Sequence, residues 1–297
     1  MSTREVCSIT YDVLILGSGP AGLSAALQCS ARGKTALVIG NPPQTSLLAK
    51  AELVDNYLGL PNISGSAMID AFYTHASKAG GVSFVEGRAL NAMSMGGGFY
   101  VSVGSDVYQG RAVILASGVA RARPYPGEQE LLGKGVSYCA TCDGMLYRGR
   151  DVAVIGLAQD AHEEAAMLAK IGCKVTFIAP RRPDGLDDAI PFIKAAKLSI
   201  IGTEKVEGVL ADDQAIPCDG VFLLRDTVAP SALFPGLATE SGYIQVDRTM
   251  ATNLPGVFAA GDCTGLPLQV SKAVGEGQTA AHFATQWLDA QNKQIHN

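Results

Sequence analysis

The chain has 297 residues, 47% of them hydrophobic, and a formal net charge of -5 at pH 7. Two domains are favoured, because a single core stops growing at about 250 to 300 residues. The charge excludes a general nucleic-acid binder, no run of about 18 apolar residues could span a membrane, and seven cysteines in so long a chain are untypical of a secreted disulfide framework. We therefore expect a cytoplasmic protein that binds neither nucleic acid nor membrane.

The first predicted unit is a strand, a glycine-rich turn and a helix. The apolar run 11–16 is followed by the turn 17–22, which reads G-S-G-P-A-G, and by a helix of small residues that runs to Arg32. A G-x-G-x-x-G turn between a strand and a helix is typical of a dinucleotide site. Gly17 turns the chain, Gly19 lets backbone amides approach a pyrophosphate, and Gly22 brings the helix against the strand.

Farther along the chain, Cys139 and Cys142 form a C-x-x-C pair in the segment C-A-T-C-D-G. Such a pair has three interpretations: a redox pair, half of a zinc site, or two unrelated buried thiols. A structural zinc site needs four ligands, whereas the sequence has no second C-x-x-C and its four histidines are scattered. We therefore predict a redox pair and no metal site.

The strand, turn and helix return 139 residues after their first appearance. A strand at 152–155, a turn that begins at Gly156, a helix at 160–171 and a strand at 175–178 repeat the first unit and its following strand. Two such units predict an α/β protein with two Rossmann-like three-layer nucleotide-binding domains. The second turn reads G-L-A-Q-D-A, so the methyl group of Ala158 stands where a diphosphate would approach. A nucleotide would be crowded there.

The turn 17–22, the motif 139–144 and the segment F-A-A-G-D at 258–262 together resemble the low-molecular-weight thioredoxin reductases over nearly the whole chain. The resemblance implies an FAD-binding domain formed by residues 1–117 and 243–297. Residues 118–242 would form a domain inserted in the first, which carries the redox disulfide. It also implies a homodimer that reduces thioredoxin or a thioredoxin-like protein through FAD and the cysteine pair.

The resemblance further implies roles for individual residues. Cys142 would be the thiol nearest the flavin and Cys139 the thiol that attacks the disulfide of the incoming protein. Asp143 would be the acid/base that moves the proton; a helix-capping aspartate is the alternative, and the two roles are compatible. The implied FAD contacts are Gly17, Gly19, Pro20, Ala21, Gly22, Asn56, Ala116, Ser117, Gly118, Gly261, Asp262, Lys272 and Ala273.

The inserted domain departs from the family pattern. The family usually has G-G-G-D-S-A at the second turn and an H-R-R motif that recognises NADPH, where this chain has G-L-A-Q-D-A and A-P-R-R-P-D. These changes, with K-A-V-G-E-G-Q at 272–278, resemble the pyridine-nucleotide-independent branch, which includes ferredoxin-linked flavin thioredoxin reductases. We therefore expect electrons from ferredoxin or another donor that is not NADPH.

An acidic ferredoxin would need a basic docking face. The candidates are Arg121, Arg123, Lys134, Arg148 and Arg150, interrupted by Glu128 and Glu130. A solvated surface is the favoured interpretation of this cluster. Three other functions stay open: an ordinary NADPH-dependent thioredoxin reductase, a small-molecule dithiol oxidase on the same scaffold, and a non-catalytic flavin redox sensor.

Overall fold

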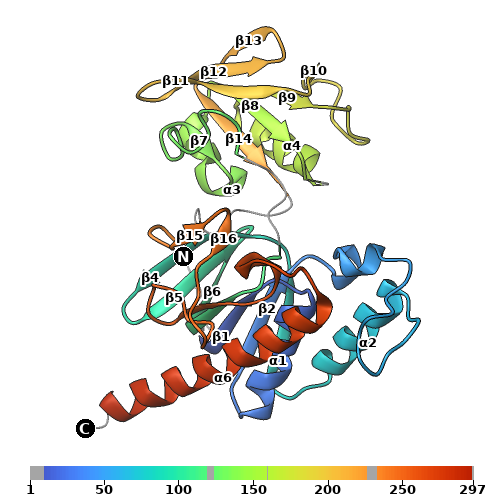
Figure 1. Ribbon diagram of the computed structural model, residues 1–297. Helices are drawn as coiled ribbons and strands as arrows, with labels where there is room; N and C mark the ends of the chain where they lie inside the picture. The colour runs from blue at the N-terminus through green and yellow to red at the C-terminus, as the bar shows by residue number, and fades with distance from the viewer. Residues whose placement is uncertain (1–9, 119–123, 159, 226–232, 296–297) are drawn as a thin grey trace, which may run out of the picture. The chain divides into compact units, whose positions relative to one another are not determined.

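A computed structural model describes residues 10–118, 124–158, 160–225 and 233–295 (Figure 1). The chain forms two compact units, one of residues 1–120 and 229–297 and the other of residues 121–228. The second unit is thus inserted in the chain of the first, and the predicted α/β class with two Rossmann-like domains is confirmed.

The second crossing between the units lies earlier than the sequence analysis placed it. It falls after residue 228 rather than after residue 242. The physical reason is a hairpin, in which β15 (Thr239–Glu240) pairs antiparallel with β16 (Tyr243–Ile244). A boundary at residue 242 would cut this hairpin in two.

The first unit is built on a seven-stranded sheet. Five strands run parallel: β1 (Thr10–Leu16), β2 (Ala36–Gly40), β3 (Val82–Glu86), β6 (Asp106–Leu115) and β17 (Val257–Ala259). The antiparallel pair β4 (Ala89–Met95) and β5 (Gly98–Val103) extends the sheet beside the first half of β6. Apolar side chains on both faces of β1 are fully buried, as expected for a strand covered on both sides.

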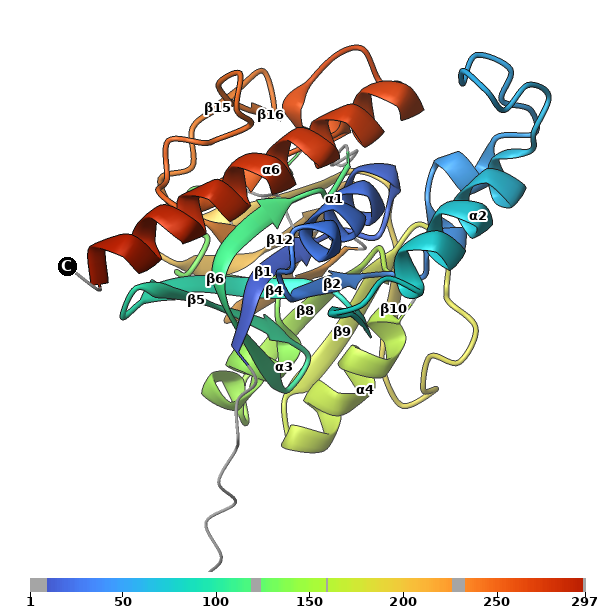
Figure 2. The same ribbon diagram turned by 90° about the horizontal axis from the view of Figure 1, so that it is seen from below.

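Helices α1 (Pro20–Ala31) and α6 (Val270–Ile295) lie side by side over this sheet (Figure 2). Their contact is close because small residues face each other, and a Cβ added at Gly277 would lie 2.1 Å from the Ala21 carbonyl oxygen. The Ser24 hydroxyl also donates to the Val274 carbonyl, at 2.7 Å. The first turns of the two helices are therefore held together. Helix α2 (Gly65–Ser77) packs beside α1, and the short helices η1 (Pro43–Thr45), η2 (Leu48–Lys50) and η4 (Asp262–Thr264) lie in loops.

The second unit has a five-stranded parallel sheet in the order β10 (Phe192–Lys194), β9 (Lys174–Ala179), β8 (Asp151–Gly156), β14 (Gly220–Leu224) and β7 (Val136–Ser137). Its helices are α3 (Ala140–Asp143), η3 (Gly144–Tyr147) and α4 (Ala161–Ile171), and a meander of β11 (Leu198–Gly202), β12 (Val206–Ala211) and β13 (Gln214–Pro217) completes it. The cysteine pair follows the end of β7 directly. Among the described residues, no helix is both long and apolar enough to cross a membrane.

Candidate active site

The glycines of the first turn are required by close backbone contacts. Gly17 has a φ of +127°, and a Cβ there would lie 2.1 Å from the Ala116 carbonyl oxygen. A Cβ at Gly22 would lie 1.8 Å from the Gly17 carbonyl oxygen. Gly19 differs, because no atom lies within 4 Å of its added Cβ. Gly17 and Gly22 shape the turn, and Gly19 leaves open space in front of it.

That open space is faced by backbone amides at the start of α1. Pro20 occupies the first helical position, and the first hydrogen bond of the helix runs from Leu23 N to Gly19 O. Within the described part of the chain, the N–H groups of Ser18, Gly19, Ala21 and Gly22 have no acceptor. Free amides and a helix dipole at one point suit an anionic diphosphate. The residues therefore fit the pyrophosphate of FAD.

A network of hydrogen bonds fixes the segment after β17 against α6. The Lys272 ammonium donates to the Gly261 carbonyl, the Thr264 hydroxyl and Glu276 Oε2, each at 2.9 Å. Glu276 Oε2 also accepts from Gly261 N at 2.9 Å and from the Thr264 hydroxyl at 2.8 Å. Both charged side chains are mostly buried. The network thus holds the turn that carries Asp262, whose pKa is raised by burial and by Glu276 and lowered by Lys272.

The predicted FAD contacts at Lys272 and Ala273 have structural partners of their own. The three acceptors of Lys272 belong to the network, while Ala273 N donates to Gln269 O and its buried side chain faces Gly261. Helix α6 begins at Val270, so its first-turn amides belong to residues 270–272. A contact of Lys272 or Ala273 with FAD stays a prediction.

Two residues that the sequence analysis missed join this region. Glu276 is the centre of the network, and its i, i+4 spacing from Lys272 at the start of a predicted helix was the available signal. Gln269 accepts a hydrogen bond from Asn56 Nδ2 at 2.8 Å. Asn56 is thereby tied to the residue that precedes α6.

Ala116, Ser117 and Gly118 follow the end of β6. Ala116 N donates to Leu16 O at 2.8 Å, which brings this segment beside the end of β1 and the turn at Gly17. Gly118 has a φ of +70°, and no atom lies within 4 Å of its added Cβ. The three residues therefore stand at the rim of the predicted flavin site.

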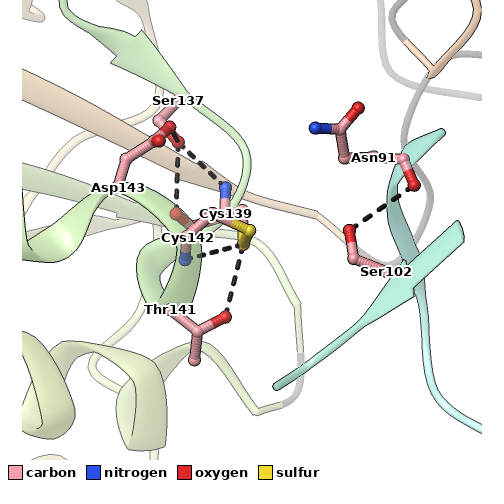
Figure 3. Close-up of a disulfide and its surroundings, with 7 residues drawn as sticks. All are labelled: Asn91, Ser102, Ser137, Cys139, Thr141, Cys142 and Asp143. Atoms are coloured by element: carbon pink, nitrogen blue, oxygen red, sulfur yellow. Dashed lines mark hydrogen bonds between the residues drawn. A yellow bond between two sulfur atoms is a disulfide. The ribbon is translucent and has the colours of Figure 1, made fainter. Parts of the chain in front are cut away.

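Cys139 and Cys142 are joined by a disulfide (Figure 3). Cys139 is 5% exposed, whereas Cys142 is exposed. Cys139 Sγ accepts a hydrogen bond from Cys142 N at 3.0 Å and lies 3.3 Å from the Thr141 hydroxyl. Two donors beside this sulfur would stabilise a thiolate on Cys139 after reduction.

Asp143 lies at the end of α3 and is held by a serine rather than by a helix terminus. The Ser137 hydroxyl donates to Asp143 Oδ2 at 2.7 Å (Figure 3). The 3-10 helix η3 begins directly after Asp143, but the Asp143 side chain forms no capping hydrogen bond with it. The structure therefore brings Cys139, Cys142 and Asp143 together and does not support the capping alternative.

The model for the pyridine nucleotide-disulphide oxidoreductase family matches residues 11–277 of the chain. The chain belongs to this family. A thioredoxin reductase of Listeria monocytogenes is 33% identical, with 94% of each chain covered. A ferredoxin-flavin thioredoxin reductase of Clostridium acetobutylicum has a TM-score of 0.85 at 38% identity, covering 96% of this chain and 99% of its own. A thioredoxin reductase of Gloeobacter violaceus has a TM-score of 0.76 at 30% identity, covering 95% of each chain.

These comparisons confirm the predicted resemblance to the low-molecular-weight thioredoxin reductases and their ferredoxin-linked branch. The protein is a flavoprotein disulfide oxidoreductase, and its cofactor is FAD. The groups that would hold it are the amides of Ser18, Gly19, Ala21 and Gly22, the segment 116–118 and the turn at 261–262. Among the residues that the structure describes, no three histidine, cysteine or acidic side chains gather in a way that could hold a metal ion.

The second glycine turn of the chain uses its amides differently from the first. Leu157 N and Ala158 N both donate to the Leu224 carbonyl, at 2.8 Å each. The equivalent amides of the first turn, on Ser18 and Gly19, have no acceptor in the described chain. The two amides that would face a pyrophosphate therefore donate instead to the last residue of β14.

An arginine of the second unit also forms hydrogen bonds within its own loop. Arg182 donates to Leu186 O at 3.3 Å, to Asp187 O at 3.4 Å and to Asp188 Oδ1 at 2.9 Å. Arg182 is thus bound by its own loop, at the position where a ribose 2′-phosphate would be recognised.

Three of the five candidate basic residues lie in the described part of the second unit. Lys134, Arg148 and Arg150 are exposed, while Arg121 and Arg123 lie outside the described residues. Glu128 is only 1% exposed, and its carboxylate accepts two hydrogen bonds from Arg225, at 2.5 and 2.8 Å. Glu128 is therefore a buried structural residue and not a surface acid that interrupts a docking face.

Proposed function

We propose that this flavoprotein reduces the disulfide of thioredoxin, or of a thioredoxin-like protein, with electrons from ferredoxin or another donor that is not NADPH. The observation that carries the proposal is the paired donation of Leu157 N and Ala158 N to Leu224 O. These amides cannot serve a pyrophosphate unless the turn rearranges. The names of similar proteins, among them a ferredoxin-flavin thioredoxin reductase, support the same donor and acceptor. The proposal includes a cytoplasmic homodimer.

The energetics of such a reaction are favourable. Plant-type ferredoxins have potentials of about -400 mV and thioredoxin about -270 mV. Two electrons that fall through about 130 mV release on the order of 6 kcal/mol. Reduced ferredoxin can therefore drive thioredoxin reduction without a second energy source.

The arrangement of the cysteine pair supports the following roles for residues of this chain in the proposed reaction. FAD, when bound, would supply two electrons to the disulfide, and the exposed residue Cys142 would be the cysteine that receives them. The Cys139 thiolate, stabilised by Cys142 N and Thr141, attacks the thioredoxin disulfide and forms a mixed disulfide. The Cys142 thiolate then attacks Cys139, which restores the internal disulfide and releases reduced thioredoxin. Asp143 carries the proton to the departing thiolate.

An anaerobic turnover assay tests the proposal. Thioredoxin reduction is measured with reduced ferredoxin, NADPH or NADH as the only donor, with Cys139→Ser and Cys142→Ser as controls. We expect turnover with ferredoxin alone and none in either variant. Equal turnover with NADPH would establish the ordinary reductase instead. Oxygen consumption with small dithiols, without thioredoxin reduction, would establish a dithiol oxidase, and slow transfer from every donor would favour a redox sensor.

A further inference from the structure

The hydroxyl of Ser137 links the backbone of Cys139 to the carboxylate of Asp143. Ser137 is the last residue of β7 and is 5% exposed. Its oxygen accepts a hydrogen bond from Cys139 N at 3.1 Å. Two oxygens lie within reach of its single hydrogen, Asp143 Oδ2 at 2.7 Å and Cys139 O at 3.2 Å. The hydroxyl oxygen therefore accepts one hydrogen bond, and its hydrogen can be donated to either of two oxygens.

This choice matches the two protonation states of a carboxyl group. A serine hydroxyl donates one hydrogen bond and accepts two. When Asp143 is ionised, the hydroxyl donates to Oδ2. When Oδ2 carries a proton, that proton is donated to the serine oxygen, and the serine hydrogen turns to Cys139 O. In both states every group has a partner, and Cys139 N keeps its acceptor.

We propose that Ser137 is the positioning residue for Asp143 and that its hydroxyl changes acceptor as Asp143 gains or loses a proton. The inference rests on the proposed function in one respect, the acid/base role of Asp143. When the reduced pair becomes a disulfide, two thiol protons and two electrons leave it, and the substrate disulfide receives both. Asp143 takes one of these protons from the pair and gives it to the departing thiolate of the substrate. The serine hydroxyl lets the carboxyl do so without losing a hydrogen bond in either state.

Tyr147 and helix α4 are the neighbours of Asp143 that the structure describes on the adjoining elements. The carboxylate interacts with Tyr147 on η3, whose pKa is raised by burial and, to a lesser extent, by Asp143. Tyr147 also interacts with Arg150, Asp219 and Cys218. Helix α4 packs against α3, and at Gly144 it presents Leu168 and Ile171, which carry no charge. Among the described residues, Ser137 thus bonds directly to the Asp143 carboxylate and Tyr147 interacts with it electrostatically.

Ser137→Ala removes the donor to the ionised carboxylate and the acceptor of Cys139 N. A hydrogen bond to a charged group contributes more than one to a neutral group, so the variant should favour protonated Asp143. Dithiol oxidation should therefore slow wherever it depends on the ionised carboxylate, and the pH profile of the rate should depart from that of the wild type. Ser137→Thr keeps the hydroxyl and should restore the profile. Ser199→Ala, on β11 of the same unit, is the matched control and should leave it unchanged.

The experiment follows oxidation of the dithiol-reduced protein by a small aromatic disulfide from pH 5 to 9, with the FAD content and melting temperature of each variant as a check on folding. In the Asp143→Asn background, Ser137→Ala should change the rate less than about twofold at any pH, because the two residues act as one unit. A Ser137→Ala profile that superimposes on the wild type would overturn the proposal, as would an equal change in the Asp143→Asn background. Because this assay uses no thioredoxin and no ferredoxin, failure of the proposed function would appear in the turnover assay alone.

Discussion

At the scale of single residues, the two cysteines differ in their surroundings. Cys142 is exposed, whereas Cys139 is buried and accepts a hydrogen bond from the Cys142 amide. Under the proposed roles, the Cys142 thiolate that remains in Cys139→Ser should donate charge to the flavin and give a long-wavelength absorbance band. Cys142→Ser should give no band. The measurement is an absorbance spectrum from 500 to about 700 nm at pH 8, above the pKa of about 7 that such thiols reach. A band in Cys142→Ser alone would reverse the two roles.

The open space at Gly19 gives a second prediction. Because nothing lies within 4 Å of its added Cβ, Gly19→Glu should fold normally while its carboxylate occupies the diphosphate position. Loss of two hydrogen bonds to a charged group, at about 1.5 to 3 kcal/mol each, should weaken FAD binding by at least about 100-fold. Gly80→Glu is the matched control, since Gly80 is exposed and equally open. Full yellow colour in purified Gly19→Glu would contradict the assignment of the first turn.

The remaining described cysteines should be unreactive in the folded protein. Burial raises the pKa of Cys29 and Cys263 to about 12 and that of Cys218 to about 11, and it also raises the pKa of Cys173. Among the described cysteines, reduction should therefore expose two new alkylation sites at pH 8, Cys139 and Cys142. Mass spectrometry of oxidised and reduced samples checks this, and labelling of Cys263 at pH 8 would contradict it.

The same thiols predict how stability depends on pH. An unfolded cysteine ionises at about 8.5, whereas these buried thiols keep their protons to about pH 11 or 12. Their contribution to the free energy of unfolding is complete below about pH 8.5. It is lost as the pH rises from there to the folded-state pKa of about 11 or 12. Urea denaturation at pH 8 and pH 10.5 should show this decrease. A decrease that is unchanged in Cys29→Ser and Cys218→Ser variants would assign it to other groups.

At the scale of elements, the start of α6 depends on one ion pair. Lys272→Met removes three hydrogen bonds that fix the turn at Gly261 and Asp262. Hydrogen bonds to charged groups are worth about 1.5 to 3 kcal/mol, so FAD affinity should fall by about tenfold or more. Lys293→Met, at the exposed end of the same helix, is the control. Equal FAD affinity in both variants, measured by flavin fluorescence, would show that the network does not support the cofactor site.

Local patterns predicted the elements well and their long-range partners poorly. The strand at 11–16, the helix up to Arg32 and the repeat at 152–178 match β1, α1, β8, α4 and β9 within two residues, because hydrophobic periodicity and glycine turns act over short distances. Glu128 was predicted to be a surface acid, yet it is buried because it pairs with Arg225, which lies 97 residues later. The serine beneath Asp143 gave no signal either, since a buried hydroxyl has no periodicity of its own.

At the scale of the whole molecule, the chain contains two strand-turn-helix units of the nucleotide-binding type, and their turn amides have different partners. Among the described residues, four amides of the first turn and the start of α1 have no acceptor, whereas in the second turn Leu157 N and Ala158 N donate to Leu224 O. The disulfide lies in the second unit, whose turn no longer presents these amides to a nucleotide. The central claim is therefore that the inserted unit has kept the thiol chemistry of the family and lost its nucleotide site.

Anaerobic stopped-flow mixing with millimolar NADPH tests this claim most directly. Two missing pyrophosphate hydrogen bonds, at about 1.5 to 3 kcal/mol each, should weaken NADPH binding by roughly two to four orders of magnitude. We predict that the flavin absorbance stays constant with NADPH and is bleached by reduced ferredoxin under the same conditions. Rapid, saturable bleaching by NADPH would contradict the claim and restore the ordinary NADPH-dependent thioredoxin reductase.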